Sequence, residues 1–112
     1  MKPRVAYKIL TAEQMRALEE DRFEGAPIDV ADGYIHLSTA EQVAGTLDAH
    51  FAGHGDLFLA AVDLDEAGDS VRWEASRGGA LFPHLYAPLR RDLVLASGPL
   101  RRDCAGAPIL PR

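Results

Sequence analysis

Three short apolar segments of the sequence contain most of the side chains that could do chemistry. They are residues 34–39, residues 72–74, which hold the single tryptophan, and residues 81–86. Burying a polar side chain costs free energy unless it is hydrogen-bonded, so polar groups in such segments need a partner or a ligand. We therefore expect one shared site built from His36, Ser38, Thr39, Trp73, Glu74, Phe82, His84 and Tyr86.

Strand periodicity predicts which of these side chains lie together. Side chains two positions apart on a strand point to the same face of a sheet. The sets that share a face are then Tyr34, His36 and Ser38; Arg72 and Glu74; and Phe82, His84 and Tyr86. Three such strands would form the polar floor of a cleft, with Glu74 and His36 as catalytic candidates. The expected ligand-binding residues are Ser38, Thr39, Trp73, Phe82, His84 and Tyr86.

Each of these residues also has a structural interpretation, which stays open at this point. Ser38 and Thr39 are favourable helix N-caps, although the start of a helix also attracts anions. His36 fits a core histidine bonded to the backbone, and Trp73 fits a core aromatic residue. If the clusters are purely structural, replacing His36 or Glu74 should mainly lower stability, by about 1–3 kcal/mol.

Several specific chemistries are not indicated by the sequence. It has no glycine-rich phosphate loop, no nucleophile elbow and no spacing typical of a metal site, so we expect no bound metal. The net charge of −5 and the pI near 5.2 argue against a nucleic-acid partner. The remaining prediction is a cleft for a small molecule, formed by a monomer or a weak dimer.

Length and composition predict one domain over residues 1–112, with its core in about 5–100 and a loosely packed tail at 101–112. Of the 112 residues 47% are hydrophobic and 26% charged, which is enough to bury one core. The single cysteine, Cys104, cannot form an internal disulfide. Because no segment resembles a signal peptide or a membrane span, we expect a cytoplasmic protein with no membrane partner.

Hydrophobic periodicity and turn residues predict an α+β fold, with two helices early and a strand-rich second half. Thr11 and Gln14 form a capping-box pattern for a helix that reaches about Arg22, and Ser38 is expected to cap a second helix that reaches Phe51. Residues 23–33 read as a loop, and Pro83 is expected to confine the extended residues 81–86 to a sheet edge or an irregular segment. The predicted strands are 5–10, 34–37, 57–62, 71–75 and 92–97.

The sequence resembles a family of small bacterial proteins of unknown function, DUF952. The resemblance rests on YKIL, GYIHLSTAEQV, RWE and LFPHLYAPL, and extends from about Val5 to Leu100. It implies an ADP-ribosyltransferase-like fold with a split sheet, in which NAD binds in a cleft between two sheets.

The resemblance also implies roles for individual residues. Tyr7 occupies the first-strand position of the fold's pattern, together with Lys8. Ser38 and Thr39 are similar to a Ser-Thr motif that supports the nicotinamide pocket. Glu74 is similar to the late-strand acid that orients a ribose hydroxyl and stabilises an oxocarbenium ion. We therefore expect a small ligand, with a nucleotide as the narrower class, or alternatively an NAD-dependent transferase that uses Glu74.

Overall fold

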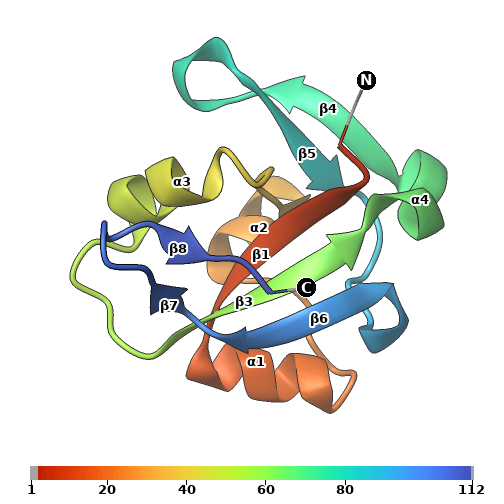
Figure 1. Cartoon of the computed structure of the whole chain (residues 1–112). Coiled ribbons are helices and arrows are strands. Elements are labelled where there is room, and N and C mark those ends of the chain that lie inside the picture. The colour runs from red at the N-terminus through yellow and green to blue at the C-terminus, as the bar shows by residue number, and fades with distance from the viewer. Residues whose placement is uncertain (1–2, 112) are drawn as a thin grey trace.

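Two three-stranded antiparallel sheets organise the molecule (Figure 1). The first sheet has the order β1-β3-β6 and consists of β1 (Val5–Thr11), β3 (Leu57–Asp63) and β6 (Val94–Pro99). The second has the order β2-β5-β4 and consists of β2 (Ile35–His36), β5 (Leu81–Leu85) and β4 (Val71–Ala75). Together with the four helices of the described residues, these sheets make a compact α+β domain, the fold class that the periodicity predicts.

The computed structural model describes residues 3–111, with all of their side chains except that of Arg77. Its helices are α1 (Ala12–Glu19), α2 (Pro27–Asp32), α3 (Val43–His50) and α4 (Leu64–Ala67). Short 3₁₀ turns occupy Gly68–Ser70, Arg77–Gly79 and Arg91–Leu93. In Figure 1, α1 lies along the lower side of the first sheet, and the β4–β5 hairpin stands at the opposite end of the molecule. No helix in 3–111 is long and apolar enough to cross a membrane.

The central strand β3 of the first sheet is covered on both faces, which explains its nearly continuous apolar sequence. Alternate residues of this strand enter different hydrophobic clusters: Ala60 and Val62 belong to one, Leu57 and Leu59 to the other. The first cluster also contains residues of α1 and of the second sheet, whereas the second contains Val43 and Leu47 of α3. The expectation that residues 57–62 form a central strand is confirmed.

The two sheets meet at a single bridge between Tyr7 of β1 and Ser38, just after β2. The Tyr7 amide donates to the Ser38 carbonyl at 2.7 Å, and the Ser38 amide donates back to the Tyr7 carbonyl at 2.9 Å. This bridge corrects the expectation that Ser38 caps a helix. Because its backbone is paired in extended form, α3 begins only at Val43, after a turn in which the Gln42 amide donates to the Thr39 carbonyl.

The segment 23–33 is not entirely a loop, because α2 occupies Pro27–Asp32. The proline and glycine residues that indicate a loop in the sequence mark the start and the end of this helix. Proline is favoured at the first helical position. The Asp29 carboxylate accepts the Ala26 amide at 2.7 Å, and Gly33 ends the helix with φ +87°. Glycine adopts this left-handed conformation without a steric penalty.

The capping box of α1 is confirmed, but the helix is shorter than predicted. Thr11 and Gln14 exchange hydrogen bonds between side chain and backbone at 3.2 and 3.0 Å. The helix ends at Glu19 instead of continuing to Arg22, and Asp21 follows with φ +59°. A left-handed residue at this point turns the chain away from the helix axis.

Pro83 lies in the central strand of the second sheet and not at its edge. On one side it is paired with Trp73 of β4, and on the other its carbonyl accepts the Leu37 amide at 3.2 Å. In a strand the N and C=O of one residue point the same way, so the missing N–H of Pro83 faces the end of β2. Because β2 has only two residues, the missing N–H of Pro83 removes no hydrogen bond from the regular ladder between β2 and β5.

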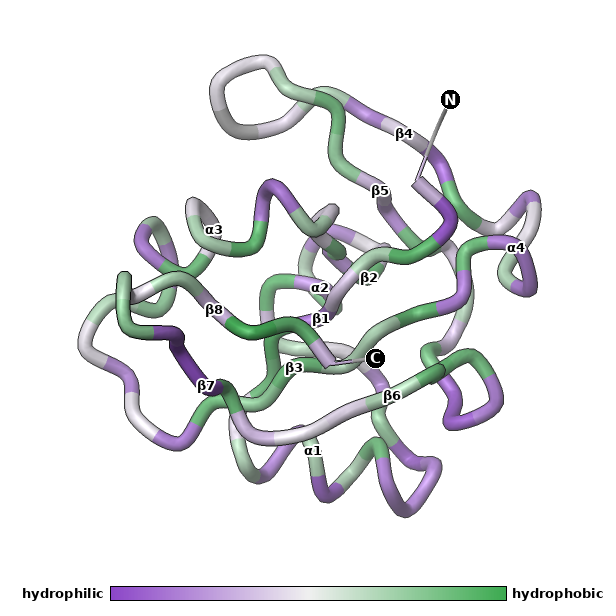
Figure 2. Tube along the Cα trace, viewed as in Figure 1, coloured by the Kyte–Doolittle hydropathy of each residue, from purple (hydrophilic) through white to green (hydrophobic). Residues whose placement is uncertain are grey.

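The tail forms a small hairpin of β7 (Arg101–Arg102) and β8 (Pro108–Ile109). Figure 2 shows a hydrophilic β7 followed by a hydrophobic stretch at β8. Leu110 packs against the second hydrophobic cluster, which ties this hairpin to the first sheet. Residue 112 of the predicted tail, and residues 1 and 2 of the predicted domain, lie outside the described residues.

Candidate functional site

Four aromatic rings, two on strands β2 and β5 and two on residues next to these strands, form one cluster. The Tyr34 ring lies 4.6 Å from His36 and 4.1 Å from His84, measured between ring centroids. Its stacking partner is Tyr86, at 5.2 Å and an interplanar angle of 15°. The guanidinium of Arg72 lies 4.9 Å from the centroid of the Tyr86 ring. The strand alternation therefore correctly placed these side chains together.

Glu74 receives two hydrogen bonds from this cluster on one carboxylate oxygen. His84 Nδ1 lies 2.8 Å and the Tyr86 hydroxyl 2.7 Å from Glu74 Oε1. These bonds, first that of Tyr86 and then that of His84, lower the pKa of the Glu74 carboxyl below its ordinary value. The hydrogen bond between Tyr86 and Glu74 also raises the pKa of the Tyr86 hydroxyl. Glu74 is therefore ionised at neutral pH and accepts both hydrogens.

A buried ion pair lies behind the ring cluster. Lys8 Nζ is 2.8 Å from Asp29 Oδ2 and also donates to the His36 carbonyl at 3.1 Å. The side chains of Lys8 and Asp29 are only 6% and 1% exposed. Asp29 in addition accepts the backbone amides of His36 and Ala26, at 3.0 and 2.7 Å. One carboxylate thus joins β1, β2 and the start of α2.

The two members of this pair differ in how burial affects them. Desolvation has the largest influence on Lys8 and lowers the pKa of its ammonium, and Asp29 opposes this only in part. Burial would raise the pKa of Asp29, but Lys8 and the donors on His36 outweigh it, so the pKa lies below its ordinary value. Asp29 has more donors than Lys8 has acceptors, which explains the difference.

His36 is held between two carboxylates. Its Nδ1 lies 2.7 Å from Asp29 Oδ1, and its Nε2 lies 3.0 Å from Asp32 Oδ2. Both ring nitrogens therefore already have a protein partner. His36 is in a position to hold the geometry of the site, but neither nitrogen is available to a ligand unless one of these bonds breaks.

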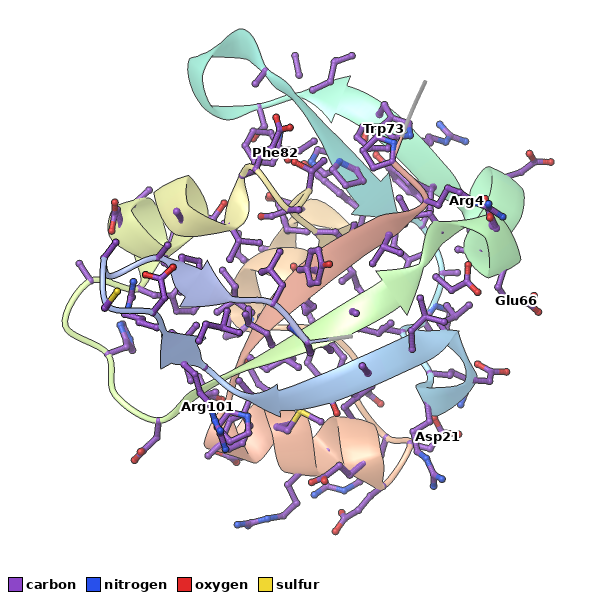
Figure 3. The ribbon with its side chains drawn as sticks, viewed as in Figure 1. Arg4, Asp21, Glu66, Trp73, Phe82 and Arg101 are labelled. Carbon is purple, nitrogen blue, oxygen red and sulfur yellow. The ribbon has the colours of Figure 1, made fainter. Side chains whose placement is uncertain are left out.

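A cavity of about 370 Å³ lies between β1, β5 and α3. This volume falls within the range of small-molecule pockets. Figure 3 shows Phe82 between the β4–β5 hairpin and α3, where it forms part of the wall. The lining also includes Tyr7, Lys8, His36, Ser38, Thr46 and His84.

The Ser38 hydroxyl offers this cavity a hydrogen-bond acceptor. Ser38 Oγ lies 2.9 Å from Thr46 Oγ1, and Thr46 donates its hydroxyl hydrogen to the Gln42 carbonyl at 3.1 Å. Ser38 must then be the donor to Thr46, which leaves its lone pairs as acceptors. Lys8 is the only Lys or Arg among the described lining residues, and Asp29 neutralises it.

The structure divides the predicted site residues into two groups. Tyr7, His36, Ser38, Phe82 and His84 all line the cavity. The remaining predicted residues are not among its described lining: Thr39, Trp73, Glu74 and Tyr86. Within that second group, Glu74 and Tyr86 reach the cavity indirectly through His84, whereas Trp73 packs against the first hydrophobic cluster.

A second, more open cavity of about 650 Å³ has Tyr34 in its lining. Tyr86 and the segment 87–90 line it, together with residues 21–24. The ring of Tyr34 contacts His36 and His84, which line the first cavity. The pKa of its hydroxyl is raised first by burial and then by Asp32 and Glu74. Tyr86 therefore borders the second cavity instead of the first.

Asp29, Asp32 and Thr46 are not among the residues predicted for the site from the sequence, and Lys8 is placed beside Tyr7 only by the resemblance. A charged residue within the apolar strand 5–10 is a signal that could have identified Lys8, since burial of a lysine requires a partner. Asp29 carried no comparable signal, because acidic residues are common in segments that read as loops. In the described part of the chain, no group of three His, Cys, Asp or Glu side chains is placed to hold a metal.

The fold and site define a small α+β protein with a cavity where its two antiparallel sheets meet. The chain belongs to the family described as protein of unknown function (DUF952), whose model matches residues 9–97. No curated protein matches the chain.

Solved structures of protein CC0527 from Caulobacter crescentus are similar to this chain. An X-ray crystal structure has 44% sequence identity and a TM-score of 0.83, and the match covers 94% of this chain and 93% of that chain. A solution NMR structure of CC0527 has a TM-score of 0.79 at 44% identity, with 95% and 92% covered. This likeness extends over nearly the whole of both chains.

Proposed function

We propose that this protein binds a small ligand in the 370 Å³ cavity, and that the bound part of the ligand is an uncharged ring such as a nucleoside. The observation that carries this proposal is the composition of the wall. Phe82 and Tyr7 supply aromatic surface, while Ser38 supplies a hydrogen-bond acceptor. Pockets of this kind combine a mainly apolar lining with a few polar groups that fix orientation.

The charge of the cavity favours the uncharged part of a ligand. Lys8 is neutralised by Asp29 at 2.8 Å, and the described lining offers no unpaired Lys or Arg for a pyrophosphate. The nucleoside end of a nucleotide such as NAD therefore fits these residues better than its phosphates do. We infer a monomer or weak dimer, because one chain is sufficient to build the cavity. We also propose a cytoplasmic protein without a nucleic-acid or membrane partner; the net charge of −5 supports the absence of a nucleic-acid partner.

An ADP-ribosyltransferase-like architecture is the finer form of this proposal. Two three-stranded sheets joined at Tyr7 and Ser38, with the cavity beside the bridge, agree with a split sheet that holds a ligand between its halves. The alternative function is NAD-dependent transfer with Glu74 as the key acid. The ionised carboxylate of Glu74 favours this alternative. Its absence from the described lining, and the paired state of Lys8, favour binding alone.

A thermal-shift panel of NAD, ADP-ribose, adenosine and nicotinamide tests the proposal. A ligand present at one hundred times its Kd adds about 2.7 kcal/mol to the free energy of unfolding, which raises Tm by several degrees. We expect a shift with at least one of these probes and a smaller shift in Ser38→Ala.

Ser97→Ala is the matched control, because Ser97 is an exposed serine on β6, outside the described lining of the cavity. It should respond to the probes like the wild type. The proposal fails if none of the probes changes Tm, or if the two serine variants respond equally. Nicotinamide release from NAD that is lost in Glu74→Gln would instead favour the transferase alternative.

A further inference from the structure

We infer that His84 Nε2 is the proton acceptor of the cavity, that Glu74 is the residue that positions it, and that the ligand brings an O–H or N–H group to this nitrogen. The inference rests on the proposed function, since it concerns the same cavity. It differs from the expectation that Glu74 and His36 are the catalytic groups and that His84 is one of the ligand-binding residues.

The hydrogen bond to Glu74 determines which nitrogen of the neutral His84 ring carries the hydrogen. An ionised carboxylate only accepts hydrogen bonds, so Nδ1, at 2.8 Å from Glu74 Oε1, must carry the hydrogen. The other ring nitrogen of a neutral imidazole then holds a lone pair. This is the arrangement by which a carboxylate fixes the tautomer of a general-base histidine.

Nε2 is open to the cavity. No described residue forms a hydrogen bond with it, although His84 is only 2% exposed. Among the described side chains no fully buried nitrogen or oxygen lacks a partner, so Nε2 must be reached by solvent. The open space that His84 borders between the sheets is the 370 Å³ cavity. The two nitrogens of His36, in contrast, both face carboxylates.

The surroundings of His84 suit proton transfer. When a ligand O–H gives its proton to Nε2, the O–H bond breaks, an N–H bond forms and the electron pair stays on the ligand oxygen. The resulting positive ring faces the Glu74 carboxylate, which Tyr86 holds in place at 2.7 Å. The other charged or titratable groups beside the ring are Arg72, its register partner on β4, Tyr34 at 4.1 Å and His36 at 5.5 Å.

The ring-nitrogen NMR signals of His84 test the inference without any ligand. Long-range ¹H–¹⁵N spectra at pH 8, with His84 assigned through His84→Gln, should show a protonated Nδ1 and the downfield ¹⁵N shift of an unprotonated Nε2. In Glu74→Ala this preference should be lost. Glu66→Ala should retain it, because Glu66 is an exposed acid on α4, far from β5 in Figure 3. A merely structural role of Glu74 would not change the tautomer.

Adenosine then separates this inference from the proposed function. Binding that moves the Nε2 signal supports both. Binding that leaves Nε2 unchanged overturns the inference, as does a protonated Nε2 at pH 8 or a tautomer that Glu74→Ala does not alter. If none of the four probes of the thermal-shift panel binds, the proposed function fails. The part of the inference that concerns a ligand on Nε2 then fails as well, whichever nitrogen of His84 carries the hydrogen.

Discussion

Replacing Asp29 with alanine is expected to lower the free energy of unfolding by about 3–5 kcal/mol, which is the cost of leaving a buried charge without its partner. Lys8 would lose its only counterion at a site where it is 6% exposed. The amides of Ala26 and His36 would also lose their acceptor. Urea denaturation measures the loss as a lower midpoint with an unchanged slope.

Asp32→Ala is the control for this variant, because Asp32 also binds His36 but its side chain is 43% exposed. Exposed pairs contribute about 0–1 kcal/mol, so Asp32→Ala should cost no more than that. Equal losses in the two variants would mean that Asp29 is not the group that joins β1, β2 and α2.

The lowered pKa of Asp29 gives the same residue a pH signature. The pKa of Asp29 in the folded protein lies below its value in the unfolded chain. Its contribution to the free energy of unfolding is therefore fully present above about pH 4 and is lost as the pH falls through the folded pKa. Wild-type stability should therefore fall more steeply in acid than that of Asp29→Asn. The check is Tm as a function of pH for both proteins.

Leu85→Ala should cost about 2–5 kcal/mol, the range for deleting a large aliphatic side chain from a closely packed core. Leu85 is 0% exposed and lies in the central strand of the second sheet, between Ile35 and Val71. It follows His84 directly, so the cavity left behind would also loosen the strand that carries the proposed proton acceptor.

The matched control lies on the same strand. Leu81 is 55% exposed, and Leu81→Ala should change the free energy of unfolding by less than about 0.5 kcal/mol. The denaturation midpoints of the two variants, measured side by side, test this difference in stability. A Leu85→Ala protein as stable as Leu81→Ala would show that the second sheet does not share a core with the first.

The sequence was most informative where one local pattern was enough. Alternation along 71–75 and 81–86 predicted the grouping of Glu74, His84 and Tyr86, because strand geometry alone decides which side chains share a face. The capping box at Thr11 is likewise local. The apolar run at 57–62 predicted a strand covered on both sides, since only such a position buries every residue.

Local patterns failed where tertiary contacts determine the structure. The helix α2 depends on Asp29, whose carboxylate is held by Lys8 from a distant strand, and no pattern within 23–33 reveals that partner. Serine is a residue type typical of helix N-caps, yet the bridge from Ser38 to Tyr7 keeps the Ser38 backbone extended. Pro83 occupies a central strand because the neighbouring strand is too short to need its missing N–H.

The central claim is that the cavity between the sheets is the ligand site, and a chemical-shift titration of ¹⁵N-labelled protein with adenosine tests it most directly. The amides that line this cavity should shift together and saturate, in particular those of Tyr7, Ser38, Phe82 and His84. Shifts confined to residues 86–90, which line the second cavity, would contradict the claim. A spectrum that millimolar adenosine leaves unchanged would contradict it for nucleosides altogether.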